Sequence, residues 1–391
     1  MPQSTPPRLP PNLRVAIIHD WLVTLRGGER VLDAMCELFP HAVVHTLVRQ
    51  PGIATPRIEA MKHVTSFADR LPMAQQKHRW LLPLYPKAIE SFDLSGFDLV
   101  LSSSHCVAKA ALPGPGAVHV CYCHTPVRYA WDRTDDYVSG SSPILQLARP
   151  ALHVAAGLLR QFDLATLDRV DRFVANSQNT ANKIAQFYHR HADVVPPPVE
   201  CDRFAQLPRV PESERYDLLL GGLVPYKRVD LAVEAWRLMP DRQLQIVGDG
   251  PERARLERTA PANVHFVGRV PEDDLAKWYA GARLFAFPGE EDFGIVPLEA
   301  QSAGVPVVAL GKGGALETVI DGQTGVFFHE STPEALVAAV QQLDQLAVDP
   351  DTCRQHARRF DRQAFLDQMT VIVADALQAP RHGRSRTHEV A

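Results

Sequence analysis

Short apolar runs alternate with helix-forming segments along the chain, and this alternation restricts the fold more than any other feature. The runs are rich in Val, Ile and Leu and too short for helices, which is typical of buried strands. Strands that alternate with helices form a parallel sheet with helices on both faces, so we predict an α/β fold. In the first half the predicted strands are Arg14–Ile18, Ala42–Leu47, Leu99–Ser102, Ala117–Cys123 and Arg172–Ala175.

The second half repeats this pattern after a proline-rich interruption at Val194–Val199. Three consecutive prolines cannot continue a helix or a central strand, and they favour a stiff, extended segment. The predicted strands of this half are Tyr216–Gly221, Gln243–Val247, Val264–Val267, Leu284–Phe287 and Val307–Ala309. The predicted helices of the whole chain include Glu29–Leu38, Val229–Leu238, Pro333–Leu346 and a last helix over Phe360–Met369.

A length of 391 residues also suits two domains rather than one. No internal sequence repeat is evident, although both halves share the same architecture. The expected organisation is a tail at 1–12, a first domain at 13–193, a linker at 194–210, a second domain at 211–359, a final helix at 360–379 and a polar, basic tail at 380–391.

The composition is that of a soluble globular protein, with 46% hydrophobic and 22% charged residues. No apolar run approaches the roughly 18 residues of a membrane-spanning helix, and the proline-rich start lacks the apolar segment of a signal peptide. We therefore expect a cytoplasmic protein. A net charge of −4 gives no indication of a nucleic-acid partner. The first half is basic, which suits an anionic surface and plain solvation equally well.

Six cysteines are scattered along the chain, and only Cys121 and Cys123 lie close together. They fall in an apolar strand without a second pair, so buried thiols are a better prediction than a metal site or a disulfide. We expect no metal and no cofactor.

The most informative motif is Pro288–Ala300, which places Glu291 and Glu299 on either side of Gly294. Glu291 lies in the loop that leaves a predicted strand, and Glu299 lies in the helix that follows. Backbone N–H groups at a helix start bind anions, and carboxylates accept hydrogen bonds from ligand hydroxyls. The motif therefore predicts a site for a polyhydroxylated or phosphorylated ligand. The alternative is a pair of surface carboxylates that cap the helix.

Further motifs accompany this loop in a defined order: Leu223–Asp230, Val247–Pro251, Val264–Gly268 and Gly311–Thr318 in the second half, and Gly27–Leu32 and Cys123–Pro126 in the first. In this order and spacing the chain resembles the retaining glycosyltransferases of family 4, strongly over 215–330 and more weakly over the first half. The resemblance implies the GT-B fold, in which two Rossmann-like domains face each other across a cleft, and a nucleotide-sugar donor.

The resemblance also implies roles for residues of the second half. Glu291 would lie beside the transferred sugar, and Lys227 would neutralise the donor diphosphate. Glu299 would accept hydrogen bonds from the ribose. The remaining donor contacts would come from backbone groups, at Asp292, Phe293 and Gly294 for the sugar and at Gly268, Arg269 and Val270 for the base.

One position departs from the family pattern. The family usually has an arginine, as a second diphosphate cation, where this chain has Gly222. Either Arg228 or a group of the first domain replaces it, or Lys227 acts alone. If Lys227 is the main remaining cation, the Lys227→Ala variant should lose most turnover.

In the first half, Gly27 and Gly28 follow the first strand and let the backbone approach a ligand, although the spacing is not that of a dinucleotide site. His124 follows the strand Ala117–Cys123, at the end of the sheet where α/β proteins bind ligands. The resemblance implies that His124 contacts the donor sugar or the acceptor, with Arg128 nearby. His19 and Asp20 are further acceptor-side candidates, and Asp20 is alternatively a loop cap.

His78–Lys87 is an aromatic and cationic stretch interrupted by prolines. It suits a membrane interface beside a lipid-linked acceptor, because Trp80, Tyr85 and Lys87 are residues found at headgroup level. A loop and helix packed on the first domain is the plainer alternative.

Taken together, the resemblance implies a metal-independent, retaining hexosyltransferase that acts on a glycan or a lipid-linked oligosaccharide. The motifs Leu223–Asp230 and Tyr122–Trp131 are similar to those of bacterial mannosyltransferases of O-antigen and exopolysaccharide assembly, which favours GDP-mannose as donor. The alternatives are a GT-B sugar-nucleotide epimerase and a catalytically silent sugar-nucleotide binding protein.

Overall fold

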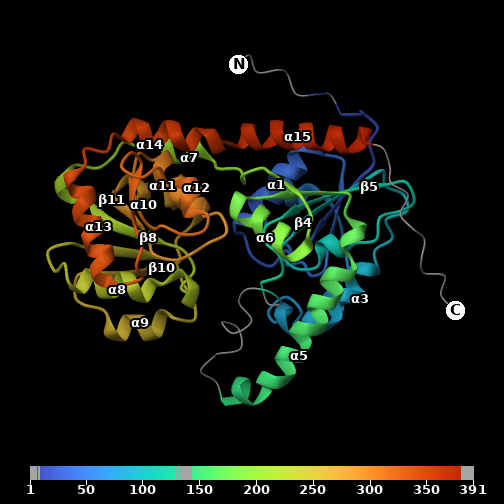
Figure 1. Ribbon diagram of the computed structural model, residues 1–391, viewed down its shortest axis with the longest axis horizontal. Helices are drawn as coiled ribbons and strands as arrows, with labels where there is room; N and C mark the ends of the chain where they lie inside the picture. The colour runs from blue at the N-terminus through green and yellow to red at the C-terminus, as the bar shows by residue number, and fades with distance from the viewer. Residues whose placement is uncertain (1–6, 8, 129–130, 132–142, 380–391) are drawn as a thin grey trace. The chain divides into compact units, whose positions relative to one another are not determined.

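The computed structural model describes residues 7, 9–128, 131 and 143–379, with the side chains described from 153 onward in the last range. These residues form two compact units (Figure 1). Unit 1 comprises the described residues up to Asn176, Thr180–Val195 and those from Phe365 onward. Unit 2 comprises Ser177–Asn179 and Pro196–Ala364.

In its described residues, unit 1 contains a parallel seven-stranded sheet of order β3-β2-β1-β4-β5-β6-β7. The strands are β1 Val15–His19, β2 Val43–Thr46, β3 Lys62–Thr65, β4 Leu99–Ser104, β5 Val118–Cys123, β6 Arg172–Ala175 and β7 Ala192–Val194. The helices are α1 Gly27–Leu38, α2 Pro56–Ala60, α3 Tyr85–Glu90, α5 Pro143–Ala165, α6 Gln178–Tyr188 and, from Phe365 onward, α15 Arg362–Gln378.

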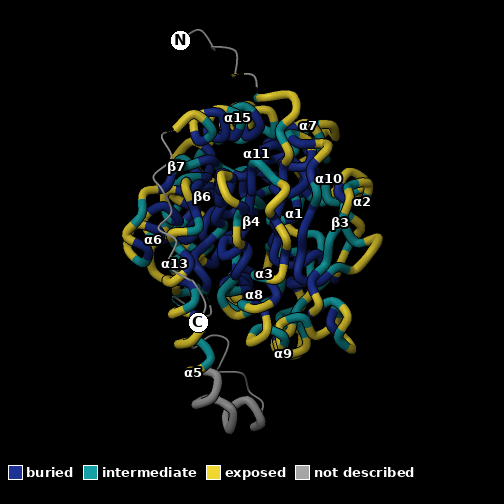
Figure 2. Tube along the Cα trace, turned by 90° about the vertical axis from the view of Figure 1, so that its right-hand side faces the viewer, coloured by how far each residue is buried: buried dark blue, intermediate teal, exposed yellow. Residues whose placement is uncertain are grey.

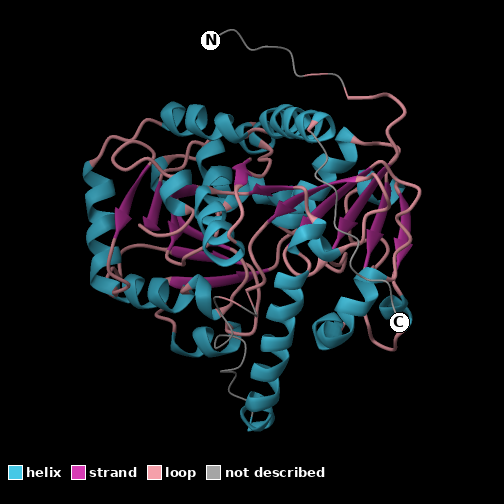
Figure 3. Ribbon diagram, turned by 45° about the vertical axis from the view of Figure 1, so that its right-hand side comes forward, coloured by secondary structure: helices cyan, strands magenta, loops and turns pink. Residues whose placement is uncertain are grey.

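Unit 2 contains a parallel six-stranded sheet of order β10-β9-β8-β11-β12-β13. The strands are β8 Tyr216–Leu220, β9 Leu244–Val247, β10 Val264–Gly268, β11 Ala282–Phe287, β12 Val307–Leu310 and β13 Gly325–Phe328. The helices are α7 Cys201–Ala205, α8 Val229–Arg237, α9 Arg253–Thr259, α10 Leu275–Ala280, α11 Ile295–Ser302, α12 Ala315–Thr318, α13 Pro333–Gln345 and α14 Pro350–Ala357. Figure 3 shows helices on both faces of each sheet.

Each sheet is buried on both faces, which explains why its strands read as continuous apolar runs. On β1, Val15 and Ile17 pack into one core with α1 and α15, whereas Ala16 and Ile18 pack into a second core with α3. The two cores of unit 2 are likewise separated by its sheet, with α8 and α13 on one face and α10 and α11 on the other. In Figure 2 the central strand β4 is dark blue along its length.

The predicted α/β class is confirmed, and the ten predicted strands are present with ends shifted by at most two residues. The strands β3, β7 and β13 were not predicted, and each lies at an edge of its sheet. An edge strand needs less apolar sequence, as Lys62-His63 at the start of β3 illustrates.

The region expected to be a linker, 194–210, contains short regular elements. Val194 ends β7, and the short helix α7 follows the prolines at Cys201–Ala205. The final helix α15 covers Arg362–Gln378.

All six cysteines are buried free thiols, which confirms the prediction for Cys121 and Cys123. Burial raises the pKa of Cys121 to about 12, so this thiol stays protonated at neutral pH. Within the described residues, no helix combines the length and the apolar character needed to cross a membrane.

Candidate active site

The loop after β8 carries the first predicted donor residues. The chain leaves β8 through Gly221, forms a short 3-10 helix at Pro225–Lys227 and enters α8 through Arg228. Arg228 has a left-handed backbone with φ of 50°, which is uncommon for a residue with a side chain. This turn directs Lys227 back over the strand end, where its Nζ lies 3.4 Å from the position of a Cβ on Gly221.

Lys227 forms an ion pair with Glu291, which lies on the loop between β11 and α11. The two side chains are 18% and 17% exposed, so solvent screens the pair less than it screens a surface pair. Two residues predicted from separate motifs, 64 positions apart, are therefore brought together within unit 2.

Glycines on two sides hold the Glu291 loop in place. A Cβ on Gly289 would lie 2.6 Å from the Tyr226 carbonyl oxygen, so only glycine fits between this loop and the Lys227 turn. On the other side, the Gly314 N–H donates to the Glu291 carbonyl oxygen at 2.8 Å. The backbone of Glu291 is thereby fixed between the loops that follow β8 and β12.

The loop continues into α11 through Asp292, Phe293 and Gly294. Asp292 and Phe293 are buried, and Gly294 precedes the helix with a left-handed φ of 85°. The helix therefore starts four positions after Glu291, at Ile295, and its first N–H groups carry the partial positive charge of a helix N-terminus. The predicted backbone donors thus lie beside the Lys227–Glu291 pair in sequence and share one loop with it.

Glu299 lies inside α11 and is only 4% exposed. The Tyr279 hydroxyl of α10 donates to its Oε2 at 2.8 Å. This bond holds one carboxylate oxygen of Glu299 within the unit. Tyr279 itself is fully buried and was not predicted, because a tyrosine within an amphipathic helix reads as an ordinary core residue.

The predicted base-binding residues lie at the end of β10. Gly268 has a φ of 88°, and its carbonyl oxygen accepts from the Gly248 N–H at 2.8 Å. Arg269 is exposed and Val270 is half-buried. Since β8, β9 and β10 are neighbouring parallel strands, the end of β10 lies at the same sheet edge as Lys227.

Gly222 faces open space, because a Cβ built on it has no neighbouring atom within 4 Å. Its candidate replacement, Arg228, forms a half-exposed ion pair with Asp230 at 3.2 Å. Lys227 is thus the more buried of these two cations, and the position of the family arginine has room for a side chain.

In unit 1, His19 and His124 are linked through a serine hydroxyl. The Ser103 Oγ lies 3.1 Å from Nδ1 of His19 and 2.8 Å from Nε2 of His124. His19 ends β1, Ser103 lies one residue before the end of β4 and His124 follows β5, so the three lie at the carboxyl edge of the sheet. Burial, and to a smaller extent the neighbouring His105 and His19, lower the pKa of His124 to about 3.

Asp20 has a structural role in this arrangement. It is fully buried, and its two carboxylate oxygens accept from four consecutive backbone N–H groups, those of residues 105–108, at 2.7–2.9 Å. The alternative role as a loop cap is the one that this geometry supports, since both oxygens are already occupied.

Gly27 and Gly28 begin α1 beside the two imidazoles. A Cβ on Gly28 would lie 3.8 Å from His124 and 3.9 Å from His19. Glu29 is buried next to them, with its Oε1 3.8 Å from Nε2 of His19. Arg128 is half-buried, and its charge is one of the smaller influences that lower the pKa of His124. Ser103 and Glu29 were not assigned roles from the sequence.

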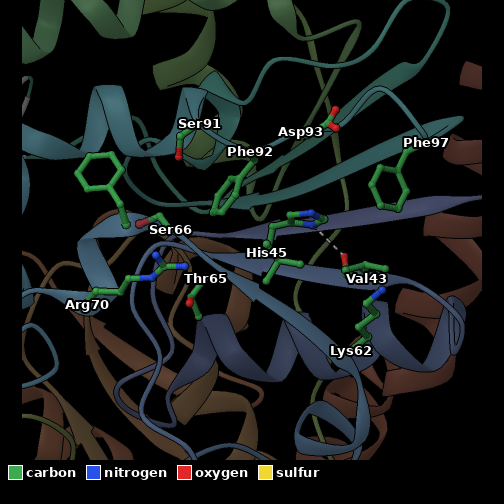
Figure 4. Close-up of a pocket in the computed structure, with 12 residues that line it drawn as sticks. Val43, His45, Lys62, Thr65, Ser66, Arg70, Ser91, Phe92, Asp93 and Phe97 are labelled. Atoms are coloured by element: carbon green, nitrogen blue, oxygen red, sulfur yellow. Dashed lines mark hydrogen bonds between the residues drawn. The ribbon is translucent and has the colours of Figure 1, made fainter.

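A separate cavity of about 400 Å³ lies along β2 and β3 of unit 1. Figure 4 shows the His45 ring between Phe92 and Phe97, and Lys62 and Arg70 lie at the margin of the cavity. None of the predicted ligand-binding residues lines this cavity.

Two family models match the chain. The one described as Glycosyltransferase Family 4 matches residues 25–203, and the one described as Glycosyl transferases group 1 matches residues 203–360. Together they span most of both units.

Curated relatives match over part of their length. A GDP-mannose-dependent alpha-(1-6)-phosphatidylinositol monomannoside mannosyltransferase of Mycolicibacterium smegmatis is 39% identical over 175 residues, which covers 38% of this chain and 46% of the relative. A D-inositol 3-phosphate glycosyltransferase of Segniliparus rotundus is 33% identical over 241 residues, which covers 53% of each protein. The alignments thus span about half the length of these relatives.

Solved structures match the whole architecture at low identity. Sucrose-phosphate synthase of Thermosynechococcus elongatus has a TM-score of 0.70 at 18% identity, with 94% of this chain and all of that chain covered. Anabaena HepE in complex with UDP and glucose has a TM-score of 0.67 at 16% identity, with 93% and 100% covered. With both family models and this fold, the chain belongs to the family 4 glycosyltransferases and has the GT-B fold.

Proposed function

We propose that this chain is a retaining glycosyltransferase that moves a hexose from a nucleotide-diphosphate sugar to a glycan or lipid-linked acceptor without a metal ion. The observation that carries the proposal is the Lys227–Glu291 ion pair beside the start of α11. It combines a cation, a carboxylate and helix N–H groups, which are the groups that a diphosphate and a sugar require.

The chemistry of donor cleavage explains why Lys227 matters. The departing nucleoside diphosphate gains negative charge in the transition state, and a cation aimed at it stabilises that charge. A diphosphate oxygen competes with Glu291 for the Lys227 ammonium. Donor binding therefore releases the Glu291 carboxylate to accept hydrogen bonds from sugar hydroxyls, which links the two roles in one exchange.

We propose front-face transfer for the retaining step. The bond from the sugar C1 to the diphosphate oxygen breaks, and the bond from C1 to the acceptor oxygen forms on the same face. The acceptor proton passes to the departing phosphate oxygen. No covalent glycosyl-enzyme is formed, so Glu291 positions and stabilises the sugar without acting as a nucleophile.

GDP-mannose is the proposed donor. The Mycolicibacterium smegmatis relative that shares 39% identity is named as GDP-mannose-dependent, which supports this choice. The backbone at Gly268, Arg269 and Val270 would lie beside the base, and Glu299, held by Tyr279, would accept from the ribose.

Unit 1 is proposed to bind the acceptor side of the reaction through His124, Gly27 and Gly28. His124 is half-buried at the end of β5, and a Cβ on Gly28 would contact its ring at 3.8 Å. The relatives named as inositol phosphate and phosphatidylinositol glycosyltransferases support a polyhydroxylated acceptor.

A peripheral membrane contact through unit 1 is the second part of the proposal. The 3-10 helix His78–Leu84 buries none of its residues, and Trp80 is 79% exposed with the Lys77 ammonium 5.5 Å from its ring centroid. Leu84 is also exposed, and Lys87 follows on α3. Exposed aromatic and cationic side chains of this kind favour anionic lipid headgroups. Sedimentation with anionic vesicles tests it, and a Trp80→Ala, Lys87→Ala double variant that binds as well as the original chain contradicts it.

A panel of GDP- and UDP-sugars tests the main proposal. A saturating donor raises the melting temperature by mass action, and we expect the largest rise with GDP-mannose. Transfer to a glycan acceptor should persist in EDTA. The absence of any stabilising sugar nucleotide contradicts the donor site. An epimerised sugar nucleotide formed without acceptor contradicts transfer and favours the epimerase alternative.

A further inference from the structure

The cavity along β2 and β3 lies on one face of the unit 1 sheet, at its edge. Residues two positions apart on a strand share a face, and so do neighbouring residues of paired strands. Val43 and His45 of β2 therefore face the same side as their register partners on β3, Lys62 and Val64. Val44, between the two β2 residues, points to the opposite face and packs into the core with α1. The cavity side thus carries a histidine and a lysine at positions where the central strands carry apolar residues.

Two segments form the walls of the cavity above these strands. One is residues 66–70, which includes a 3-10 helix, and the other is residues 91–97 after α3. Phe92 and Phe97 meet the His45 ring edge-to-face, with ring centroids 5.2 and 5.6 Å from its own (Figure 4). Phe67 is 38% exposed and adds apolar surface that is open to solvent. The volume of about 400 Å³ is within the range of small-ligand pockets, roughly 300–1,000 Å³.

His45 places a hydrogen-bond acceptor against this cavity. The residue is 3% exposed, and its Nδ1 lies 3.2 Å from the Val43 carbonyl oxygen. A carbonyl oxygen only accepts, so Nδ1 carries the proton of the neutral ring. Burial lowers the pKa of His45 to about 4, which keeps the ring neutral at pH 7. Nε2 is therefore a bare acceptor, and it has no hydrogen-bond partner among the described residues. A ligand O–H or N–H would satisfy it.

Lys62 and Arg70 make the margin of the cavity positively charged. Both side chains are exposed, and neither forms an ion pair with any residue that the structure describes. Asp93 adds one negative charge at the same margin, and its Oδ1 already accepts from Ser95. The margin keeps a net positive charge, which favours an anionic ligand.

We propose that this cavity is a second small-molecule site of unit 1, which binds an aromatic acid that carries a hydroxyl or N–H donor. The ring of the ligand packs against the phenylalanines, its donor bonds Nε2 of His45, and its acid group lies at the cationic margin. None of the residues assigned to the donor or the acceptor lines the cavity, so this inference stands without the proposed function.

Titration of the full chain with 4-hydroxybenzoate, the simplest ligand of this class, tests the site. Two-bond proton–nitrogen spectra with ¹⁵N-labelled histidine report on each imidazole, and a His45→Phe spectrum assigns the His45 signal. We expect a saturable shift of the His45 Nε2 resonance. Inorganic phosphate, an anion without a ring, should leave this resonance in place. A resonance that 4-hydroxybenzoate does not move, or that phosphate moves equally, overturns the proposal, whether or not the chain transfers a hexose.

Benzoate and the His45→Phe variant together test the hydrogen bond. Benzoate lacks the hydroxyl, so the original chain should bind it about 5-fold more weakly than 4-hydroxybenzoate. His45→Phe keeps an aromatic ring and removes the acceptor, so it should bind the two acids with equal Kd values in calorimetric titrations. A preference for the hydroxylated acid that persists in His45→Phe contradicts the role of His45.

A Lys62→Gln, Arg70→Gln double variant tests the cationic margin. Both side chains are exposed, so the fold should be retained, and the Kd for 4-hydroxybenzoate should rise by about 3-fold. The matched control is Lys77→Gln, Arg79→Gln, which removes two exposed cations of unit 1 that do not line the cavity. It should bind as the original chain does. An equal rise in both double variants would show that only the overall charge matters and would contradict a margin built for the ligand.

Discussion

The Lys227 ammonium and the Glu291 carboxylate form an ion pair across the carboxyl edge of the unit 2 sheet. The pair is largely shielded from solvent, and the glycines at 289 and 314 leave the backbone of Glu291 little freedom. Without ligand, each side chain thus neutralises the other. Donor binding requires Lys227 to exchange this partner for a diphosphate.

The first prediction concerns the missing cation at Gly222. Its Cβ direction is open and its backbone does not require glycine, so a Gly222→Arg variant should fold normally. An added cation beside the diphosphate should lower the donor KM by about 5-fold, which corresponds to about 1 kcal/mol. Steady-state kinetics with Gly222→Ala as the matched control measures this. If the donor KM of Gly222→Arg equals or exceeds that of Gly222→Ala, the diphosphate does not bind beside position 222.

Removal of the Tyr279 hydroxyl should loosen Glu299. In Tyr279→Phe the carboxylate loses its 2.8 Å hydrogen bond while the ring remains in the core. We expect a loss of about 1–2 kcal/mol in the free energy of unfolding and a several-fold rise in the donor KM. Tyr216→Phe is the control, because its hydroxyl donates to the Trp278 carbonyl oxygen in the same region. Equal donor KM values in both variants would show that Glu299 does not contact the donor.

A methyl group on Gly28 tests whether a ligand approaches the two histidines. The added carbon makes ordinary contacts of 3.8 and 3.9 Å with the rings, so Gly28→Ala should fold with unchanged stability. It occupies space over His124, and kcat/KM for transfer should fall by about 10-fold. Gly96→Ala adds a methyl where no atom lies within 4 Å and should leave both quantities unchanged. Full transfer activity in Gly28→Ala argues against acceptor binding over these rings.

How far the sequence predicts the structure depends on burial. The central strands of both sheets are recognisable because apolar residues face both cores, as Ala16 and Ile17 do on β1. The edge strand β3 carries Lys62 and His63 and lacks that signal. Likewise Lys227 and Glu291 are found through motifs with characteristic spacing. Ser103 and Tyr279 are buried polar residues at ordinary strand and helix positions, and only tertiary contacts show which side chains they bond.

Acid should destabilise unit 1 through His45. This ring is buried between Phe92 and Phe97, and burial lowers its pKa from 6.5 to about 4. Below pH 6.5 the unfolded chain binds a proton that the folded chain does not. Stability is therefore lost as the pH falls from 6.5 to about 4, by about 3 kcal/mol in total.

Urea unfolding at pH 7 and pH 4.5 measures this effect. His45→Phe should reduce the loss of stability between the two pH values, whereas His265→Phe, at an exposed imidazole, should not. His105 and His124 contribute a residual loss of the same sign, since burial lowers both of their pKa values to about 3. The same loss in His45→Phe as in the original chain contradicts the assignment.

The central claim is that Lys227 stabilises the departing diphosphate, and the most direct test is the kcat/KM of Lys227→Ala with GDP-mannose and a glycan acceptor. The matched control is Lys277→Ala. It removes a lysine of α10 that is 71% exposed and forms an ion pair with Asp274. We predict a loss of at least about 100-fold for Lys227→Ala, as expected when a group that stabilises transition-state charge is removed, and no change for Lys277→Ala. A kcat/KM for Lys227→Ala close to that of the original chain would contradict the claim.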